Sequence, residues 1–225
     1  SFVDRITVNQ KHRVDKFGTT LNIPPMGMRL ILMTLCLISP ILVARPISYS
    51  GGSTLMAFSN QAKDSVYFHY SPTYQYSLGI EAVRNRINDH EQSYVRLTYL
   101  LNRKNTQHSQ RNLYLQSGVD PFDLDQYFYG AHGDWETRRL FSGFGYKHVK
   151  DQSSDYEEQF VQLGITPYLG DYGDLHIWLM LKCKKNTLLG SWSTYPLIRL
   201  FKGNVFAELG YSDKFQWDAH LMYRF

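Results

Sequence analysis

The sequence is poor in cysteine, in long apolar runs and in any excess of one charge sign. Its 225 residues include two cysteines, which cannot supply a disulfide framework. The longest uncharged apolar run, Leu30–Ala44, spans 15 residues, fewer than a membrane-spanning helix needs. Residues 1–44 hold five bases and two acids, which leaves 19 bases and 18 acids in the rest of the chain. This balance, with no basic segment interleaved with aromatics, argues against nucleic acid as a partner.

The N-terminal region has the pattern of a secretory signal. Arg29 precedes the short apolar run, and a small residue, Ala44, ends it. We therefore expect a signal peptide at 26–44 that is cleaved after Ala44. A buried helix, a short membrane anchor and a lipoprotein modified at Cys36 are alternatives. Residues 1–25 are interpreted as an upstream extension without a part in the fold.

The remaining chain, 45–225, combines many apolar residues with a polar average. Hydrophobic content is 43%, aromatic content 15% and mean hydropathy −0.36 for the whole sequence. Apolar residues recur at every second position, which is the period of a strand with one apolar face. Phe215, Trp217, Ala219, Leu221, Tyr223 and Phe225 share one face of the last such segment. After cleavage only Cys183 would remain, so no disulfide could form within the mature chain. Backbone hydrogen bonding in a closed barrel would hold such a fold together.

Turn signals divide this region into about twelve strands, and 10 or 8 remain open. The expected ranges are 52–58, 64–71, 74–84, 92–102, 109–119, 126–137, 139–149, 157–168, 174–184, 191–201, 204–211 and 214–225. In the two glycine-rich segments near 126–136 and 140–149, the alternation does not show which residues share the apolar face. Compact turns are expected at 71–73, 170–174 and 202–204, and longer loops at 84–92, 119–125 and 150–158. Tight turns alternating with longer loops are typical of outer-membrane barrels. The predicted fold is all-β: a closed antiparallel transmembrane β-barrel over 45–225.

The end of the chain carries a resemblance. Leu-Met-Tyr-Arg-Phe, with Leu221, Tyr223 and Phe225 in phase, resembles the terminal strand of Gram-negative outer-membrane β-barrel proteins. Segments 168–176 and 196–203 look like those of small proteobacterial barrels. The resemblance implies an outer-membrane location, contact with outer-membrane lipids and recognition of the last strand by the barrel-assembly machinery. It implies no specific functional family and leaves the oligomeric state open.

The polar face of the predicted strands carries both charge signs. We expect the following side chains to line the lumen: Arg96, His132, Asp134, Glu136, His176, Lys182, Arg199, Glu208, Asp218, His220 and Arg224. Such a lumen fits a small pore, and it fits equally a structural envelope protein whose interior is closed by salt bridges. Because neither sign dominates, no strong ion selectivity is expected.

Two alternatives to a pore or structural barrel remain. His69 and Ser71 lie two apart on one strand face, with Glu81 on the next strand, which resembles the His-activated serine of outer-membrane lipid hydrolases. Pro72 departs from that family pattern. A soluble periplasmic β-barrel that binds a small ligand would show the same alternation with its apolar face inward.

His132, Asp134 and Glu136 could also be metal ligands or an acid–base set. Isolated pairs of this kind on strands are more often structural. We therefore predict no metal site and no cofactor.

Overall fold

The computed structural model describes residues 47–169, 174–214 and 216–225. The expected extension (1–25), the expected signal peptide (26–44) and Phe215 lie outside these residues. The described residues form strands and turns without a helix. The strands are β1 (Gly52–Ser59), β2 (Lys63–Ser71), β3 (Tyr76–Asn85), β4 (His90–Asn105), β5 (Ser109–Val119), β6 (Tyr127–Thr137), β7 (Leu140–Lys150), β8 (Asp155–Ile165), β9 (His176–Asn186), β10 (Ser193–Lys202), β11 (Val205–Ser212) and β12 (Gln216–Arg224).

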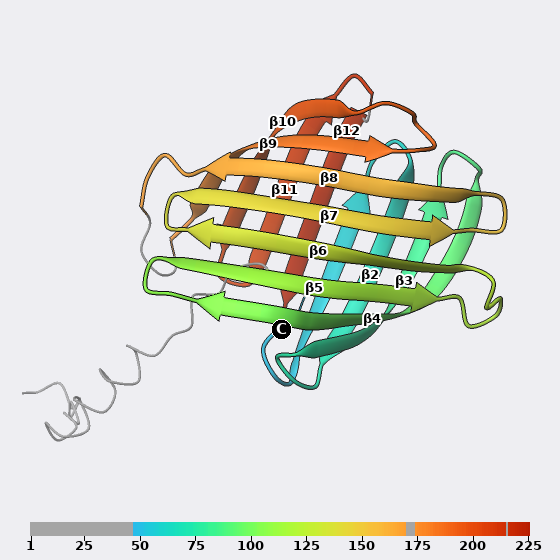
Figure 1. The fold of residues 1–225 in the computed structure, drawn as a ribbon, viewed down its shortest axis with the longest axis horizontal. Coiled ribbons are helices and arrows are strands. Elements are labelled where there is room, and N and C mark those ends of the chain that lie inside the picture. The colour runs from blue at the N-terminus through green and yellow to red at the C-terminus, as the bar shows by residue number, and fades with distance from the viewer. Residues whose placement is uncertain (1–46, 170–173, 215) are drawn as a thin grey trace, which may run out of the picture. The chain divides into compact units, whose positions relative to one another are not determined.

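The twelve strands form one closed barrel in chain order, and every neighbouring pair is antiparallel (Figure 1). Closure joins β1 to β12. The amide of Ser53 donates to the Phe225 carbonyl at 2.9 Å, and the Phe225 amide donates to the Ser53 carbonyl at 3.1 Å. The predicted closed antiparallel barrel of twelve strands is confirmed. No helix among the described residues is long and apolar enough to span a membrane.

The period-two alternation sorts side chains into an outer and an inner face. On β9, Leu179 is 49% exposed, whereas the next residue, Met180, is 5% exposed. Large apolar side chains on the outer face are 39–65% exposed; they include Leu55, Val66, Phe68, Leu78, Ile80, Val95, Leu97, Tyr99, Leu115, Phe144, Val161, Leu163, Leu179, Leu181, Ile198, Leu209, Leu221 and Tyr223. The barrel is therefore apolar outside, the reverse of a soluble barrel.

The two ends of the barrel differ in which connections they carry. We call the end where β1 begins and β12 ends the terminal rim, and it holds the connections 72–75, 106–108, 138–139, 166–175 and 203–204. The distal rim holds 60–62, 86–89, 120–126, 151–154, 187–192 and 213–215.

The connections differ in length between the two ends, but less than expected. Those of the distal rim have three to seven residues, and those of the terminal rim have two to four, apart from 166–175. The longer loops expected at 84–92 and 150–158 shrink to four residues each, because β3, β4, β7 and β8 extend further than predicted. The compact turn expected at 170–174 falls within the connection 166–175, and its residues 170–173 lie outside the described ones. In addition, β4 runs for 16 residues and contains a bulge between Leu100 and Asn102, which alternation alone did not reveal.

Side chains narrow the barrel at both rims. At the terminal rim, Ile47, which precedes β1, packs inside against Leu100 and Tyr114. At the distal rim, Leu188 of the β9–β10 connection packs against an interior cluster that includes Tyr94 and Phe128.

Candidate functional site

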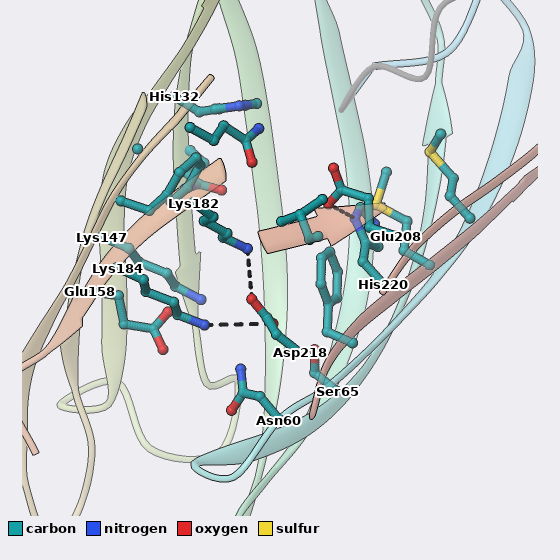
Figure 2. A pocket seen from close by; sticks show the side chains of 18 of the residues that line it. Asn60, Ser65, His132, Lys147, Glu158, Lys182, Lys184, Glu208, Asp218 and His220 are labelled. Atoms are coloured by element: carbon teal, nitrogen blue, oxygen red, sulfur yellow. Dashed lines mark hydrogen bonds and ion pairs between the residues drawn. The ribbon is translucent and has the colours of Figure 1, made fainter. Parts of the chain in front are cut away.

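The barrel interior contains a cavity of about 260 Å³ lined by inward side chains of the strands. Its lining holds six basic residues (Lys63, Arg96, Lys147, Lys182, Lys184 and Arg199) and six acidic residues (Glu81, Asp134, Glu136, Glu158, Glu208 and Asp218). Figure 2 shows several of these charged groups facing one another across the cavity. The charges balance, and most of them are held in groups.

The first group joins β10, β11 and β12. The Arg199 guanidinium donates to Glu208 at 2.6 Å, and its carbon lies 4.1 Å from the centre of the Phe141 ring. His220 Nδ1 lies 3.6 Å from the other oxygen of Glu208. Arg199, Glu208 and His220 are directly opposed on successive strands, so the barrel register creates this group.

The second group joins β3, β4 and β5. Arg96 donates to Glu81 at 2.8 Å and to Gln116 Oε1 at 2.6 Å. Its guanidinium also lies 4.2 Å from the centre of the Tyr67 ring. A planar guanidinium can stack and pair simultaneously, which fixes Arg96 against the wall.

The third group is centred on Asp218 of β12. Lys182 Nζ lies 2.8 Å from one carboxylate oxygen, Lys184 Nζ lies 3.8 Å from the other, and the Tyr195 hydroxyl also donates to Asp218. Nearby, Lys63 pairs with Glu158 at 2.7 Å, and Asn186 donates to the same carboxylate at 3.3 Å. These contacts cross the barrel rather than following one strand.

Lys147 is the exception among the basic residues. It is directly opposed to Glu158 in the register of β7 and β8, yet Glu158 pairs with Lys63 instead. The Lys147 ammonium lies 3.7 Å from the centre of the Phe128 ring and makes no hydrogen bond or ion pair within the described residues. Figure 2 shows it beside Lys184 and Glu158. Among the described residues, the Lys147 ammonium is therefore in contact with a ring face and is not paired with a carboxylate.

Most of the side chains expected to line the lumen lie in the cavity wall. These are Arg96, His132, Asp134, Glu136, Lys182, Arg199, Glu208, Asp218 and His220. His176 lies outside the cavity lining, with its ring 6.3 Å from that of Phe201, and Arg224 is buried near the terminal rim.

Four charged lining residues were missed by sequence reasoning: Lys63, Lys147, Glu158 and Lys184. Lys63 was missed because its strand was expected to begin at 64, and Lys147 because the phase of its glycine-rich strand was ambiguous. Glu158 could have been included, since it lies within the predicted strand 157–168 and in phase with Gln162. Lys184 was available to sequence reasoning, since it is in phase with Lys182 on the same predicted strand.

The residues of the hydrolase alternative, His69, Ser71 and Glu81, are not linked to one another by hydrogen bonds. The Ser71 hydroxyl accepts a hydrogen bond from the Ser48 amide at 3.0 Å, and Glu81 is engaged by Arg96. Both ring nitrogens of His69 are buried without a hydrogen-bond partner among the described residues, and the ring packs against Tyr67. The spacing of His69 and Ser71 thus reflects strand alternation.

In the second candidate set, of His132, Asp134 and Glu136, the first two side chains contact other residues. Asn112 donates to Asp134 at 2.7 Å and accepts from Arg103 at 2.8 Å. The His132 ring stacks on Tyr114. In the described part of the chain, no three potential ligands gather in an arrangement that could hold a metal ion.

The chain matches no protein-family model and no curated protein. Solved structures that are similar to it include "KdgM porin in complex with disordered oligogalacturonate" and "KdgM porin". The identities are 14% and 13%, and in each case the alignment covers 77% of this chain and 99% of that chain with a TM-score of 0.47.

Proposed function

We propose that the chain is a porin-like outer-membrane barrel whose lumen is a narrow, polar path for small solutes. The main support is the distribution of side chains between the two faces of the barrel, which is the reverse of that in a soluble barrel. Charged groups line the cavity, and large apolar side chains cover the outside. Lipid requires every backbone group to be paired internally, which a closed barrel achieves. An apolar outer surface of this extent would be unfavourable in contact with water.

The lumen favours small polar solutes of either charge sign. Its cavity is about 260 Å³, and six bases face six acids. Two ion pairs, Lys63 with Glu158 and Lys182 with Asp218, join strands that are not neighbours in the barrel. A weakly selective, low-conductance pore follows from this arrangement.

The alternatives gain no support from these contacts. A soluble ligand-binding barrel needs an apolar interior, whereas this interior is charged. A lipid hydrolase needs an accessible serine with a histidine beside it, whereas Ser71 already accepts a backbone hydrogen bond.

Reconstitution tests the proposal directly. Refolded protein should need detergent, show β-rich circular dichroism and migrate differently on gels before and after heating. In planar bilayers it should give small conductance steps with little preference for cation or anion. A monomer that stays soluble without detergent would refute the membrane location. A bilayer that contains folded protein and shows no conductance would refute the pore.

Export and assembly belong to the same proposal. Cleavage of the signal peptide at 26–44 would make Arg45 the first residue of the mature protein, which N-terminal sequencing of membrane-derived protein would check. Leu221, Tyr223 and Phe225 share the outer face of β12 and would be read by the assembly machinery.

The assembly signal is best tested at the side chain of Phe225. Deleting Phe225 would also remove the two backbone hydrogen bonds to Ser53 that close the barrel. Phe225→Ala keeps these bonds and removes only the ring. We expect it to refold normally in detergent while its yield in outer membranes falls several-fold. A normal yield in cells, or an equal failure in detergent, would show that the ring is not a recognition signal.

A further inference from the structure

A patch of unpaired basic side chains lies on the outer surface at the terminal rim. Lys104 on β4 and Arg111 on β5 are exposed, and Arg138 and Arg139 form the whole two-residue turn between β6 and β7. Ser109 of β5 is directly opposed to Thr137 of β6, so the β4–β5 turn is the neighbour of the arginine turn. Figure 1 shows both turns at the same end of the barrel.

The register places part of this patch in one outward row. Lys104 is directly opposed to Arg111, Arg111 to Trp135, and Trp135 to Ser142 on β7. Directly opposed side chains have Cβ atoms about 4.5–5.5 Å apart, and like charges at that spacing destabilise a sheet. A cost of this kind calls for a compensating anion.

In the part of the chain that the structure describes, no acidic side chain pairs with these bases. Among the described residues, Lys104, Arg111, Arg138 and Arg139 take part in no ion pair. The exposed arginines of the distal rim behave differently: Arg84 pairs with Asp89 at 2.9 Å and Arg86 with Asp64 at 2.6 Å.

Turn geometry does not explain the two arginines either. Neither Arg138 nor Arg139 has a positive φ, and the Thr137 hydroxyl caps the turn by accepting from the amides of Arg139 and Leu140. Many residue types would fit such a turn.

The surroundings are those of a membrane interface. Trp135, 39% exposed, stands in the basic row itself, and Tyr99 and Leu115, 42% and 43% exposed, follow it toward the middle of the barrel. An indole at the boundary between apolar and charged surface is typical of headgroup depth.

We propose that Lys104, Arg111, Arg138 and Arg139 form a binding surface for the phosphate of anionic phospholipid headgroups. Guanidinium groups bind phosphate through paired hydrogen bonds, and lysine adds a point charge. The proposal rests on the membrane location proposed above. Short turns mark the periplasmic side of such barrels, and four of the five connections at this rim have two to four residues. On that orientation the rim would meet the inner, phospholipid leaflet.

The test uses the refolded full chain in neutral detergent. Phosphatidylglycerol and phosphatidylcholine are titrated separately, and bound lipids are counted by native mass spectrometry at low and high salt. We expect phosphatidylglycerol to bind about tenfold more tightly at low salt, since each base near an anionic surface adds attraction. Salt should reduce that preference by screening.

Matched double variants locate the surface. Lys104→Gln with Arg111→Gln should remove most of the preference, and Arg138→Gln with Arg139→Gln should do likewise. Arg84→Gln with Arg86→Gln on the distal rim, whose arginines are already paired, should leave it unchanged. Equal binding of the two lipids, a preference that survives both terminal-rim variants, or tighter binding of lipid A than of phosphatidylglycerol would overturn the proposal.

Failure of this inference is distinguishable from failure of the proposed function. If the chain folds only in detergent and shows no lipid preference, the headgroup surface is refuted and the membrane barrel stands. If the chain is soluble and folded without detergent, both are refuted.

Discussion

Glu208 and Leu209 are neighbours on β11 and lie in opposite environments. Glu208 faces inward, is 8% exposed and is engaged by Arg199 and His220 from two other strands. Leu209 faces outward and is 51% exposed. The contribution of Leu209 therefore depends on its depth in the bilayer, whereas that of Glu208 depends on partners on the two neighbouring strands. The outer face behaves as a set of separate sites and the inner face as a network.

The largest effect is expected from breaking that network at Glu208. Glu208→Ala leaves the Arg199 charge without its carboxylate inside the barrel and should lower the free energy of unfolding by about 3–5 kcal/mol. Urea unfolding in detergent, followed by circular dichroism, measures the loss.

A double variant serves as the control for this prediction. Arg199→Ala combined with Glu208→Ala should recover a substantial part of the loss, because no isolated charge remains. Losses that simply add would show that the interior residues act independently.

The next largest effect concerns the outer face. Leu181 lies at the midpoint of β9 and is 52% exposed, so Leu181→Arg should cost about 2–4 kcal/mol in a lipid bilayer. Val205→Arg is the matched control: Val205 is also outward, at 51% exposed, but begins β11 at the terminal rim, where the cost should be at most about 1 kcal/mol. Equal costs at the two depths would mean that the apolar face does not meet a bilayer.

A smaller effect is expected at Ser71. Ser71→Ala removes the acceptor of the Ser48 amide hydrogen bond, worth about 0.5–1.5 kcal/mol. Any lipid hydrolysis by the purified protein should be unchanged, because the contacts give Ser71 a structural role. Hydrolysis that disappears with Ser71→Ala would restore the enzyme alternative.

The smallest stability effect is expected at Lys147. Lys147→Gln breaks no ion pair and should change the free energy of unfolding by less than about 1 kcal/mol. It should still shift the reversal potential in a salt gradient toward cations, since the lining then holds five bases and six acids. Lys63→Gln changes the lumen charge equally but removes the ion-pair partner of Glu158. The Lys63→Gln variant should therefore be clearly less stable than Lys147→Gln. A similar loss of stability in both variants would mean that Lys147 has a structural partner after all.

Strand number and face assignment could be predicted because they depend on local sequence. Leu179 and Met180 took the predicted faces, since alternation on a strand is fixed by backbone geometry. Turn lengths could not be predicted in the same way, because β3 and β4 lengthen through pairing with each other. The bulge at Leu100 and Asn102 likewise depends on how β4 meets β5.

By itself, the sequence determined an all-β chain with one apolar and one charged face on each strand, and hence a barrel with its apolar side outward. Only the tertiary structure decided which charges meet. Lys63 pairs with Glu158 across 95 positions of the chain, and Asp218 gathers Lys182 and Lys184, while Lys147 faces Glu158 in register and loses it to Lys63. Register and closure bring these groups within a few ångströms, and no local pattern encodes distances between strands that far apart in the sequence.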